Sequence, residues 1–203
     1  MNLLIHLRMS GDLRVEDGSQ PDLTHDRLIV YFEDGARLVF NDTRKFGRVW
    51  LVPDPKIVLG KLGPDPFDAD LTPDAFYGLL HAKHTRIKPL LLNQDFIAGI
   101  GNIYSDEALF RAKIHPLTAS NRLSPQDAGN LLQSIRDVLS EAIQHNGTSI
   151  DWVYRGGSFQ NHFKVYQRTG EPCAICGTPI ERMVLGQRGT HFCPYCQPLK
   201  AGA

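Results

Sequence analysis

The sequence predicts an α+β protein in which a strand-forming first third precedes a helical middle third and a four-cysteine zinc finger. Three observations support this order. Apolar residues before position 60 stand in short β-forming runs, those of the middle third recur at helical spacing, and all four cysteines lie beyond position 170. Strands followed by helices, rather than alternating with them, indicate segregated β and α parts.

The first strands are indicated by a hairpin signal. Arg27–Phe32 and Ala36–Phe40 are β-forming runs joined through Asp34-Gly35. An Asp-Gly turn supplies the positive φ that a tight hairpin needs. The stretch 59–72 is rich in proline, glycine and aspartate and indicates a linker. Further strands are expected over residues 3–7 and 47–52.

Helices are predicted in the middle third. The clearest covers Pro125–Gln144, where Ser124 suits the N-cap and proline suits the first helical position. Its apolar residues follow helical spacing, and Asn146-Gly147 provides a stop. Two more are expected over 73–83 and 103–112, the second entered through the glycine-rich segment 98–102. A second linker, Gly156-Gly157-Ser158, precedes the cysteines.

The cysteines form two pairs, Cys173/Cys176 and Cys193/Cys196, in the spacing C-x2-C-x16-C-x2-C. Two intervening residues let both thiolates of a pair reach one tetrahedral metal, which is typical of a structural zinc site. Two disulfides or a redox dithiol are the alternatives. One structural Zn²⁺ is favoured, because nothing in the sequence marks secretion. Four thiolates leave no open coordination position, so this metal is expected to hold a fold rather than do chemistry.

The overall composition gives little support to the binding of a charged partner. The 203 residues include 22 Lys plus Arg and 22 Asp plus Glu, so the formal net charge is zero. No apolar run reaches membrane-spanning length and the first residues do not form a signal peptide, so an intracellular, reducing location is expected. The segment from residue 161 onward is nevertheless basic. It carries Lys164, Arg168, Arg182, Arg188 and Lys200 against Glu171 and Glu181.

Several residues suggest contacts with a ligand, each beside a plainer alternative. Gly99–Asn102 could cradle a phosphate at a helix start or could simply be a helix-entry turn, and the residues alone leave the two even. Met9 and Phe46 would ordinarily be core residues, but both stand beside turn residues, which suits loop tips. Arg188 lies between two glycines, where a tight hairpin tip would project it outward.

Longer strings carry a family resemblance. The segment Leu92–Phe110, followed by Ile114-His115-Pro116, closely resembles the helix–two-turn–helix segment of formamidopyrimidine-DNA glycosylases. The cysteine region resembles the zinc finger of that family, and two earlier strings resemble its intercalation loops. These strings are Gly170–Cys173, Cys176–Ile180, Gln187-Arg188 and Cys196-Gln197 for the finger, and His6–Gly11 and Asp42–Gly47 for the loops.

The resemblance runs from about Leu3 to Gln197, which is essentially the whole chain. It implies a partial N-terminal β-sandwich domain over residues 1–66 and a helix–two-turn–helix DNA-binding domain over 67–155. A linker and a β-hairpin zinc finger over 156–203 complete it. It also implies the repair of oxidised purines such as formamidopyrimidine and 8-oxoguanine: excision of the base, then strand cleavage by β,δ-elimination.

Site residues follow from the same resemblance. Met9, Arg44 and Phe46 correspond to the set that fills the gap left by an everted base. Arg188 corresponds to a phosphate-binding residue that also acts in the second elimination. The residues expected to contact DNA are His25, Arg44, Lys83, Lys88, Asn102 and Arg188.

The family's nucleophile is an N-terminal proline followed by glutamate, and this sequence begins Met1-Asn2-Leu3. The proline, the glutamate and a catalytic lysine of the next strands are therefore expected to be absent. A misassigned start, a shortened gene or a deliberate fragment would each explain this. Residues 1–60 are then expected to be less stable than residues 70–203, because their sheet would lack paired strands.

Two functions are weighed from the sequence. The first is a bifunctional DNA glycosylase/AP lyase, and the alternative is a non-catalytic binder of damaged DNA. A zinc-ribbon interaction module without a DNA role is more distant. The expected partner is double-stranded DNA with oxidised bases or abasic sites, bound by a cytoplasmic, nucleoid-associated monomer. The segment Tyr154–Phe163, where a base-covering loop could lie, leaves the preferred lesion open.

Overall fold

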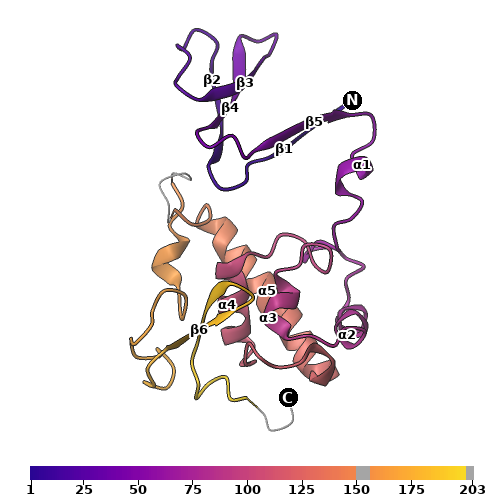
Figure 1. The fold of residues 1–203 in the computed structure, drawn as a ribbon, viewed down its shortest axis with the longest axis vertical. Coiled ribbons are helices and arrows are strands. Elements are labelled where there is room, and N and C mark those ends of the chain that lie inside the picture. The colour runs from indigo at the N-terminus through magenta and orange to yellow at the C-terminus, as the bar shows by residue number, and fades with distance from the viewer. Residues whose placement is uncertain (150–155, 200–203) are drawn as a thin grey trace. The chain divides into compact units, whose positions relative to one another are not determined.

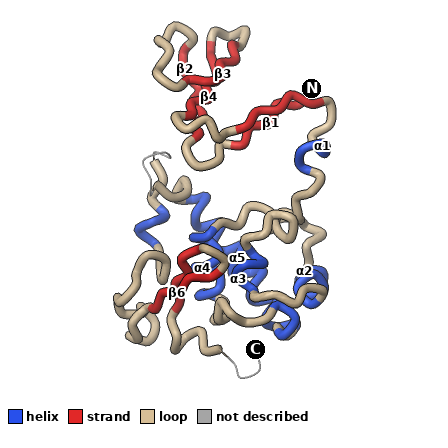
Figure 2. Tube along the Cα trace, viewed as in Figure 1, coloured by secondary structure: helices blue, strands red, loops and turns tan. Residues whose placement is uncertain are grey.

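A computed structural model describes residues 1–149 and 156–199 (Figure 1). The chain forms two compact units: Met1–Gly60 with Thr148–Gly157, and Lys61–Gly147 with Ser158–Ala203. Strands dominate the first unit, whereas the second is mainly helical with one hairpin (Figure 2). The predicted α+β class is thereby confirmed. The predicted boundary at residue 155, the start of the Tyr154–Phe163 segment and Lys200 lie outside the described residues.

The first unit contains two antiparallel sheets. Strand β1 (Asn2–His6) pairs with β5 (Arg48–Val52), and the other sheet has the order β2-β4-β3. Its strands are β2 (Gly11–Asp17), β3 (Asp26–Tyr31) and β4 (Ala36–Asp42), and a single turn of helix, α1 (Lys56–Leu59), follows β5. The predicted hairpin is present, with Gly35 at φ +88°. Strand β2 was not expected, because its alternating acidic residues are poor strand formers that pairing with β4 overrides.

The second unit is built on helices α2 (Pro73–His81), α4 (Asn102–Arg111) and α5 (Pro125–Gln144). Ser124 and Asp127 close a capping box at the start of α5, as the sequence indicated for Ser124. The short α3 (Ile87–Leu91) was not expected, because five residues are too few to show a helical period. Two 3-10 turns, η1 (Ser120–Arg122) and η2 (Phe159–His162), complete the helical elements of the described residues.

The core of the second unit lies where α5 packs against α2 and α4. Hairpin β6–β7 then packs on α4 through β7. Strand β6 is Glu181–Leu185 and β7 is Arg188–Phe192. No helix among the described residues is long and apolar enough to cross a membrane. Fully or nearly fully buried members of this core include Phe76, Leu80, Ile97, Ile100, Leu109, Leu131, Leu132 and Ile135.

Candidate nucleic-acid interface and zinc centre

The four cysteines converge on one point. All four sulfur atoms lie within 4.8 Å of one another, and three of their separations are 3.5, 3.5 and 3.9 Å. Sulfurs about 2.3 Å from one tetrahedral zinc would lie roughly 3.8 Å apart, whereas a disulfide needs about 2.05 Å. The geometry therefore fits the structural Zn²⁺ predicted from the spacing and does not fit two disulfides.

The backbone around the cysteines supports metal binding. The amide of Ile175 donates to Cys173 Sγ at 3.5 Å, and that of Cys196 donates to Cys193 Sγ at 3.4 Å. Such N–H donors stabilise thiolate charge. A hydrogen bond with Thr178 is the main cause that lowers the pKa of Cys176 to about 6. This hydrogen bond favours the thiolate form of Cys176, which is the form that binds metal.

The zinc centre is joined to the helical core by apolar packing. Cys173 and Cys193 are buried in one cluster with Phe110 of α4, Val165 and Ile180. The side chain of Gln197, itself fully buried, adds two hydrogen bonds. It accepts from the amide of Cys193 at 2.9 Å and donates to the carbonyl of Ile114 at 2.8 Å. The finger is thus a fixed part of the second unit.

A buried carboxylate fixes the segment that leads into the finger. Glu107 of α4 accepts backbone hydrogen bonds from Lys164, Val165 and Tyr166 at 2.9, 3.0 and 2.8 Å. Burial raises the pKa of Glu107, and the three donors oppose that effect. The helix therefore holds residues 164–166 by a side chain that the sequence analysis did not single out.

Strand β7 is held by a buried ion pair between Lys88 of α3 and Asp106 of α4. Lys88 Nζ lies 2.5 Å from Asp106 Oδ1, and Asp106 Oδ2 accepts from the amide of His191 at 2.9 Å. Lys88 Nζ also donates to the carbonyl of Gly189 at 3.0 Å. Burial lowers the pKa of Lys88, and Asp106 opposes that effect. Lys88, Asp106 and the backbone of β7 form what we call the β7 clasp.

The β7 clasp shows how Lys88 is held in the fold, and the contact of Lys88 with DNA stays a prediction. Lys88 was expected to contact a DNA phosphate, but its side chain is 0% exposed and its ammonium is already bonded to a carboxylate and a carbonyl. A buried, paired ammonium offers no donor at the surface. Lys88 therefore fastens the hairpin in this structure. Asp106, one turn after Asn102 on α4, was missed, although the i, i+4 spacing places both on one helix face.

Asn102 begins α4 and also reaches β7. Its Nδ2 donates to the carbonyl of Gly189 at 3.1 Å, and its buried Oδ1 finds no partner among the described residues. Gly101 and Gly99 leave open space where a Cβ would stand, and Gly99 has φ +80°. The entry to α4 therefore leaves its backbone approachable, as a phosphate cradle requires.

Arg188 is the first residue of β7 and is exposed at the hairpin tip. It pairs with Leu185 across a two-residue turn, Gly186-Gln187, whose φ angles are +58° and +62°. Two positive φ values are typical of the tight turns that join antiparallel strands. The expected tip position of Arg188 is thus what the structure shows. The β7 clasp holds the strand that begins with Arg188, and the zinc ligand Cys193 directly follows the end of that strand.

In the first unit, Met9, Arg44 and Phe46 lie together. Arg44 Nη1 is 4.0 Å from Met9 Sδ, and the Arg44 guanidinium carbon lies 4.8 Å from the Phe46 ring centre. Met9 is 68% exposed and Phe46 is 51% exposed. Exposed apolar tips around an arginine are loop residues, not the core residues that their type would favour. We call these three residues the wedge set.

The two remaining predicted contacts are less organised. His25 has φ +80°, and its Nδ1 lies 3.0 Å from Arg27 Nη2. Lys83 is exposed just beyond the end of α2, and its carbonyl accepts from Ser120 Oγ at 2.6 Å. His25 lies in the first unit and Lys83 in the second. A role in DNA contact stays a prediction for both.

Comparison with known families assigns all three parts of the chain. The formamidopyrimidine-DNA glycosylase N-terminal domain matches residues 1–49, and the H2TH domain of the same enzymes matches residues 62–153. The zinc finger found in FPG and IleRS matches residues 170–199.

Individual relatives of the chain belong to the same family. The formamidopyrimidine-DNA glycosylase of Herpetosiphon aurantiacus is 46% identical over 202 residues, covering 96% of this chain and 74% of that protein. The Chloroflexus aurantiacus protein of the same name is 47% identical over 201 residues, covering 96% and 72%. The chain thus spans about three quarters of the length of these relatives.

Similar solved structures also come from this family. The Lactococcus lactis Fpg in complex with DNA containing an abasic site has a TM-score of 0.86 at 39% identity, covering 97% of this chain and 75% of that one. A MutM bound to DNA that contains carbocyclic 8-oxo-G has a TM-score of 0.85 at 40% identity, covering 97% and 74%. Sequence and structure together place this chain in the formamidopyrimidine-DNA glycosylase family.

Proposed function

We propose that this protein is a base-excision repair enzyme, a DNA glycosylase/AP lyase acting on duplexes with oxidised purines or abasic sites. The observation that carries the proposal is the fixed hairpin tip with exposed Arg188, fastened to α4 by the β7 clasp and braced by the zinc centre. Its relatives are named for formamidopyrimidine excision, and its structural neighbours hold 8-oxo-G or abasic DNA.

Arg188 serves as the phosphate-binding residue of this proposal. A guanidinium is always charged and offers several donors in a fixed plane, which matches the oxygens of a phosphate. The second elimination expels a phosphate, so a charged donor at that phosphate stabilises the leaving group. The open entry to α4 at Gly99–Asn102 provides a second phosphate contact through backbone N–H groups.

The wedge set serves lesion recognition. A base must leave the stack before its glycosidic bond can be attacked, and the gap left behind needs to be filled. The Met9 and Phe46 side chains supply exposed apolar surface for that gap, and Arg44 supplies donors for the edge of the partner base. The protein would work as a monomer in the cytoplasm, close to the nucleoid, where reducing conditions keep its four thiolates available for zinc.

Strand cleavage tests the proposal. The zinc-loaded protein is incubated with duplexes carrying 8-oxoguanine, an abasic site or no lesion, with and without borohydride. We expect cleavage products from the two lesion duplexes only, and a borohydride-trapped adduct whose peptide map identifies the attacking amine. Lesion-preferring binding without cleavage or adduct would contradict the enzyme and support the non-catalytic binder.

Arg188→Ala provides a sharper version of the assay. Cleavage should stop after the first elimination, since the phosphate of the second loses its donor. Arg122→Ala is the matched control, because Arg122 is another exposed arginine of the same unit and lies on η1, which contacts α2. Complete cleavage by the Arg188 variant would remove the hairpin tip from the chemistry.

A further inference from the structure

The wedge set is carried by two loops that share one buried residue. Met9 lies between β1 and β2, whereas Arg44 and Phe46 lie between β4 and β5. Asp42, the last residue of β4, stands opposite Gly11, the first residue of β2. It is 1% exposed. A buried carboxylate at this point faces both loops at their roots.

The carboxylate of Asp42 binds both loops directly. Its Oδ1 accepts from Ser10 Oγ at 2.6 Å and from the Arg44 amide at 3.2 Å. Its Oδ2 accepts from the Gly47 amide at 2.7 Å. Each of these donors belongs to the wedge set or is its immediate neighbour in the chain. One side chain therefore fixes the backbone beside all three wedge residues.

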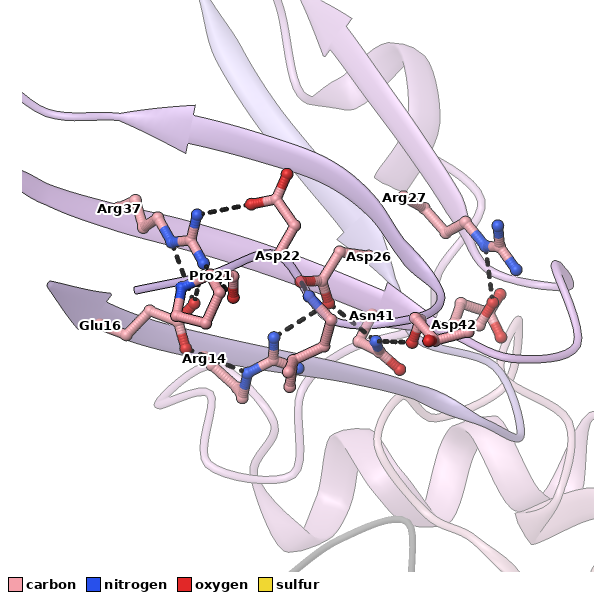
Figure 3. A network of polar contacts seen from close by, with 11 residues as sticks. Arg14, Glu16, Pro21, Asp22, Asp26, Arg27, Arg37, Asn41 and Asp42 are labelled. Carbon is pink, nitrogen blue, oxygen red and sulfur yellow. Dashed lines mark hydrogen bonds and ion pairs between the residues drawn. The ribbon is translucent and has the colours of Figure 1, made fainter. Parts of the chain in front are cut away.

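The backbone of Asp42 extends the same contacts to His25. The Asp42 amide donates to the carbonyl of His25 at 3.0 Å, and the Asp42 carbonyl accepts from Arg27 Nε at 3.0 Å (Figure 3). Arg27 in turn reaches the His25 ring. His25 is therefore tied to the same residue as the wedge set.

The charge of Asp42 is met by hydrogen bonds alone. No ion pair to Asp42 occurs among the described residues, whereas Glu16 and Asp26 of the same sheet pair with arginines (Figure 3). Burial raises the pKa of Asp42, but the donors from Ser10, Gly47 and Arg44 outweigh burial and lower it overall. The ionised form is thus the one that this arrangement favours.

The two loops need such an anchor because both contain backbone strain. Arg8 has φ +56° and Lys45 has φ +58°, and neither is a glycine. A Cβ at Gly47 would stand 2.3 Å from Cζ of Phe40, so the second loop also runs against the sheet without room to shift. Strained turns persist where surrounding bonds determine them.

We propose that Asp42 is the positioning residue for lesion recognition, holding Met9, Arg44 and Phe46 in one arrangement through Ser10, the Arg44 amide and Gly47. The inference rests on the proposed function, in which the wedge set fills the gap of an everted base. Asp42 itself is buried and touches no DNA. Its role is to set the geometry of residues that do.

Asp42→Asn tests the inference, because the amide keeps the size of the side chain but replaces one acceptor oxygen by a donor. Glu16→Gln is the matched control, since it also replaces a carboxylate of this sheet by an amide. Glu16 pairs with Arg37 at the other end of the β2–β4 ladder. Each protein is titrated with an abasic-analogue duplex carrying 2-aminopurine beside the gap and with an undamaged duplex. Fluorescence reports wedge insertion, and circular dichroism reports folding.

Wild type and Glu16→Gln should prefer the lesion duplex and raise the fluorescence. Asp42→Asn should lose about tenfold in that preference and most of the fluorescence change, with binding of undamaged DNA nearly unaltered. If Asp42→Asn does not fold, Ser10→Ala, which removes one bond to the carboxylate, should show a partial loss of the same kind. A folded Asp42→Asn with wild-type preference and fluorescence would overturn the inference. A wild type without any lesion preference would overturn the proposed function, and the inference with it.

Discussion

Lys88 Nζ lies 2.5 Å from Asp106 Oδ1, and both side chains are 0% exposed. This ion pair joins α3 to α4, and through Gly189 and His191 it also holds the strand that begins with Arg188. The family resemblance assigned Lys88 to a phosphate contact, and in the structure its ammonium is buried and paired with Asp106. Its charge supports the backbone of β7 next to the tip that we propose binds DNA.

Removing one partner of this pair should be costly. Asp106→Asn leaves the Lys88 ammonium buried without its counter-charge, which typically lowers the free energy of unfolding by about 3–5 kcal/mol. Chemical denaturation of the zinc-loaded protein measures the loss. Glu141→Gln is the matched control, because its contacts with Arg111 and His162, both at 3.7 Å, are partly exposed and each should be worth less than about 1 kcal/mol. Equal losses in the two variants would show that the buried pair has no special role.

Zinc removal should release the hairpin and leave the first unit folded. Without metal, nothing holds together the four sulfur atoms that lie within 4.8 Å of one another, and the cluster of Phe110, Val165 and Ile180 loses its support. Metal analysis should give one zinc per chain. After chelation, hydrogen exchange should rise across β6 and β7 while β2, β3 and β4 keep their protection. Unchanged exchange in the hairpin would contradict a structural metal.

Much of the fold could be predicted from the sequence, and the physical reason differs from one element to the next. The zinc ligands follow from spacing alone, because two residues between cysteines leave few geometries open. Helix α5 follows from its cap and its period. Strand β2 could not be predicted, since its pairing with β4 is a long-range property of the fold that its own residues do not display.

The site was predictable where residues are exposed and not where they are buried. Arg188 and the wedge set stand beside glycines and turn residues, so their exposure could be inferred. The roles of Asp42, Asp106 and Lys88 depend on burial and on distant partners: Ser10 lies 32 positions from Asp42, and Asp106 lies 18 positions from Lys88 and 85 from His191. Nothing local in the sequence distinguishes such residues from solvated charges.

The first unit should be sensitive to acid through Asp26. Burial alone would raise the pKa of this carboxyl, but bonds from Asn41, the Leu23 amide and Arg14 lower it to about 2 from 3.8. Because the folded pKa is depressed, the stabilisation is fully present above about pH 4 and is lost as pH falls through 2. It amounts to roughly 2 kcal/mol. Unfolding at a series of pH values should show this slope, and Asp26→Asn should flatten it. A variant with the wild-type slope would assign the acid sensitivity to other groups.

Arg188→Ala should weaken binding to damaged and undamaged duplexes by a similar factor. The guanidinium is proposed to contact a phosphate, and phosphate contacts carry no sequence or lesion information. The slope of log affinity against log salt should fall in magnitude by about one. Fluorescence anisotropy over a salt series measures both quantities. Arg122→Ala should leave both unchanged, and a slope that is the same in wild type and Arg188→Ala would show that Arg188 makes no phosphate contact.

The most direct test of the account is the ratio of affinities for an abasic-analogue duplex and an undamaged duplex of the same sequence. It is measured with the zinc-loaded protein at physiological ionic strength. A zinc-braced Arg188 tip and an Asp42-anchored wedge set together predict tighter binding to the lesion duplex by at least about tenfold. Equal affinities for the two duplexes would contradict the account, because a protein that grips only phosphates cannot distinguish them.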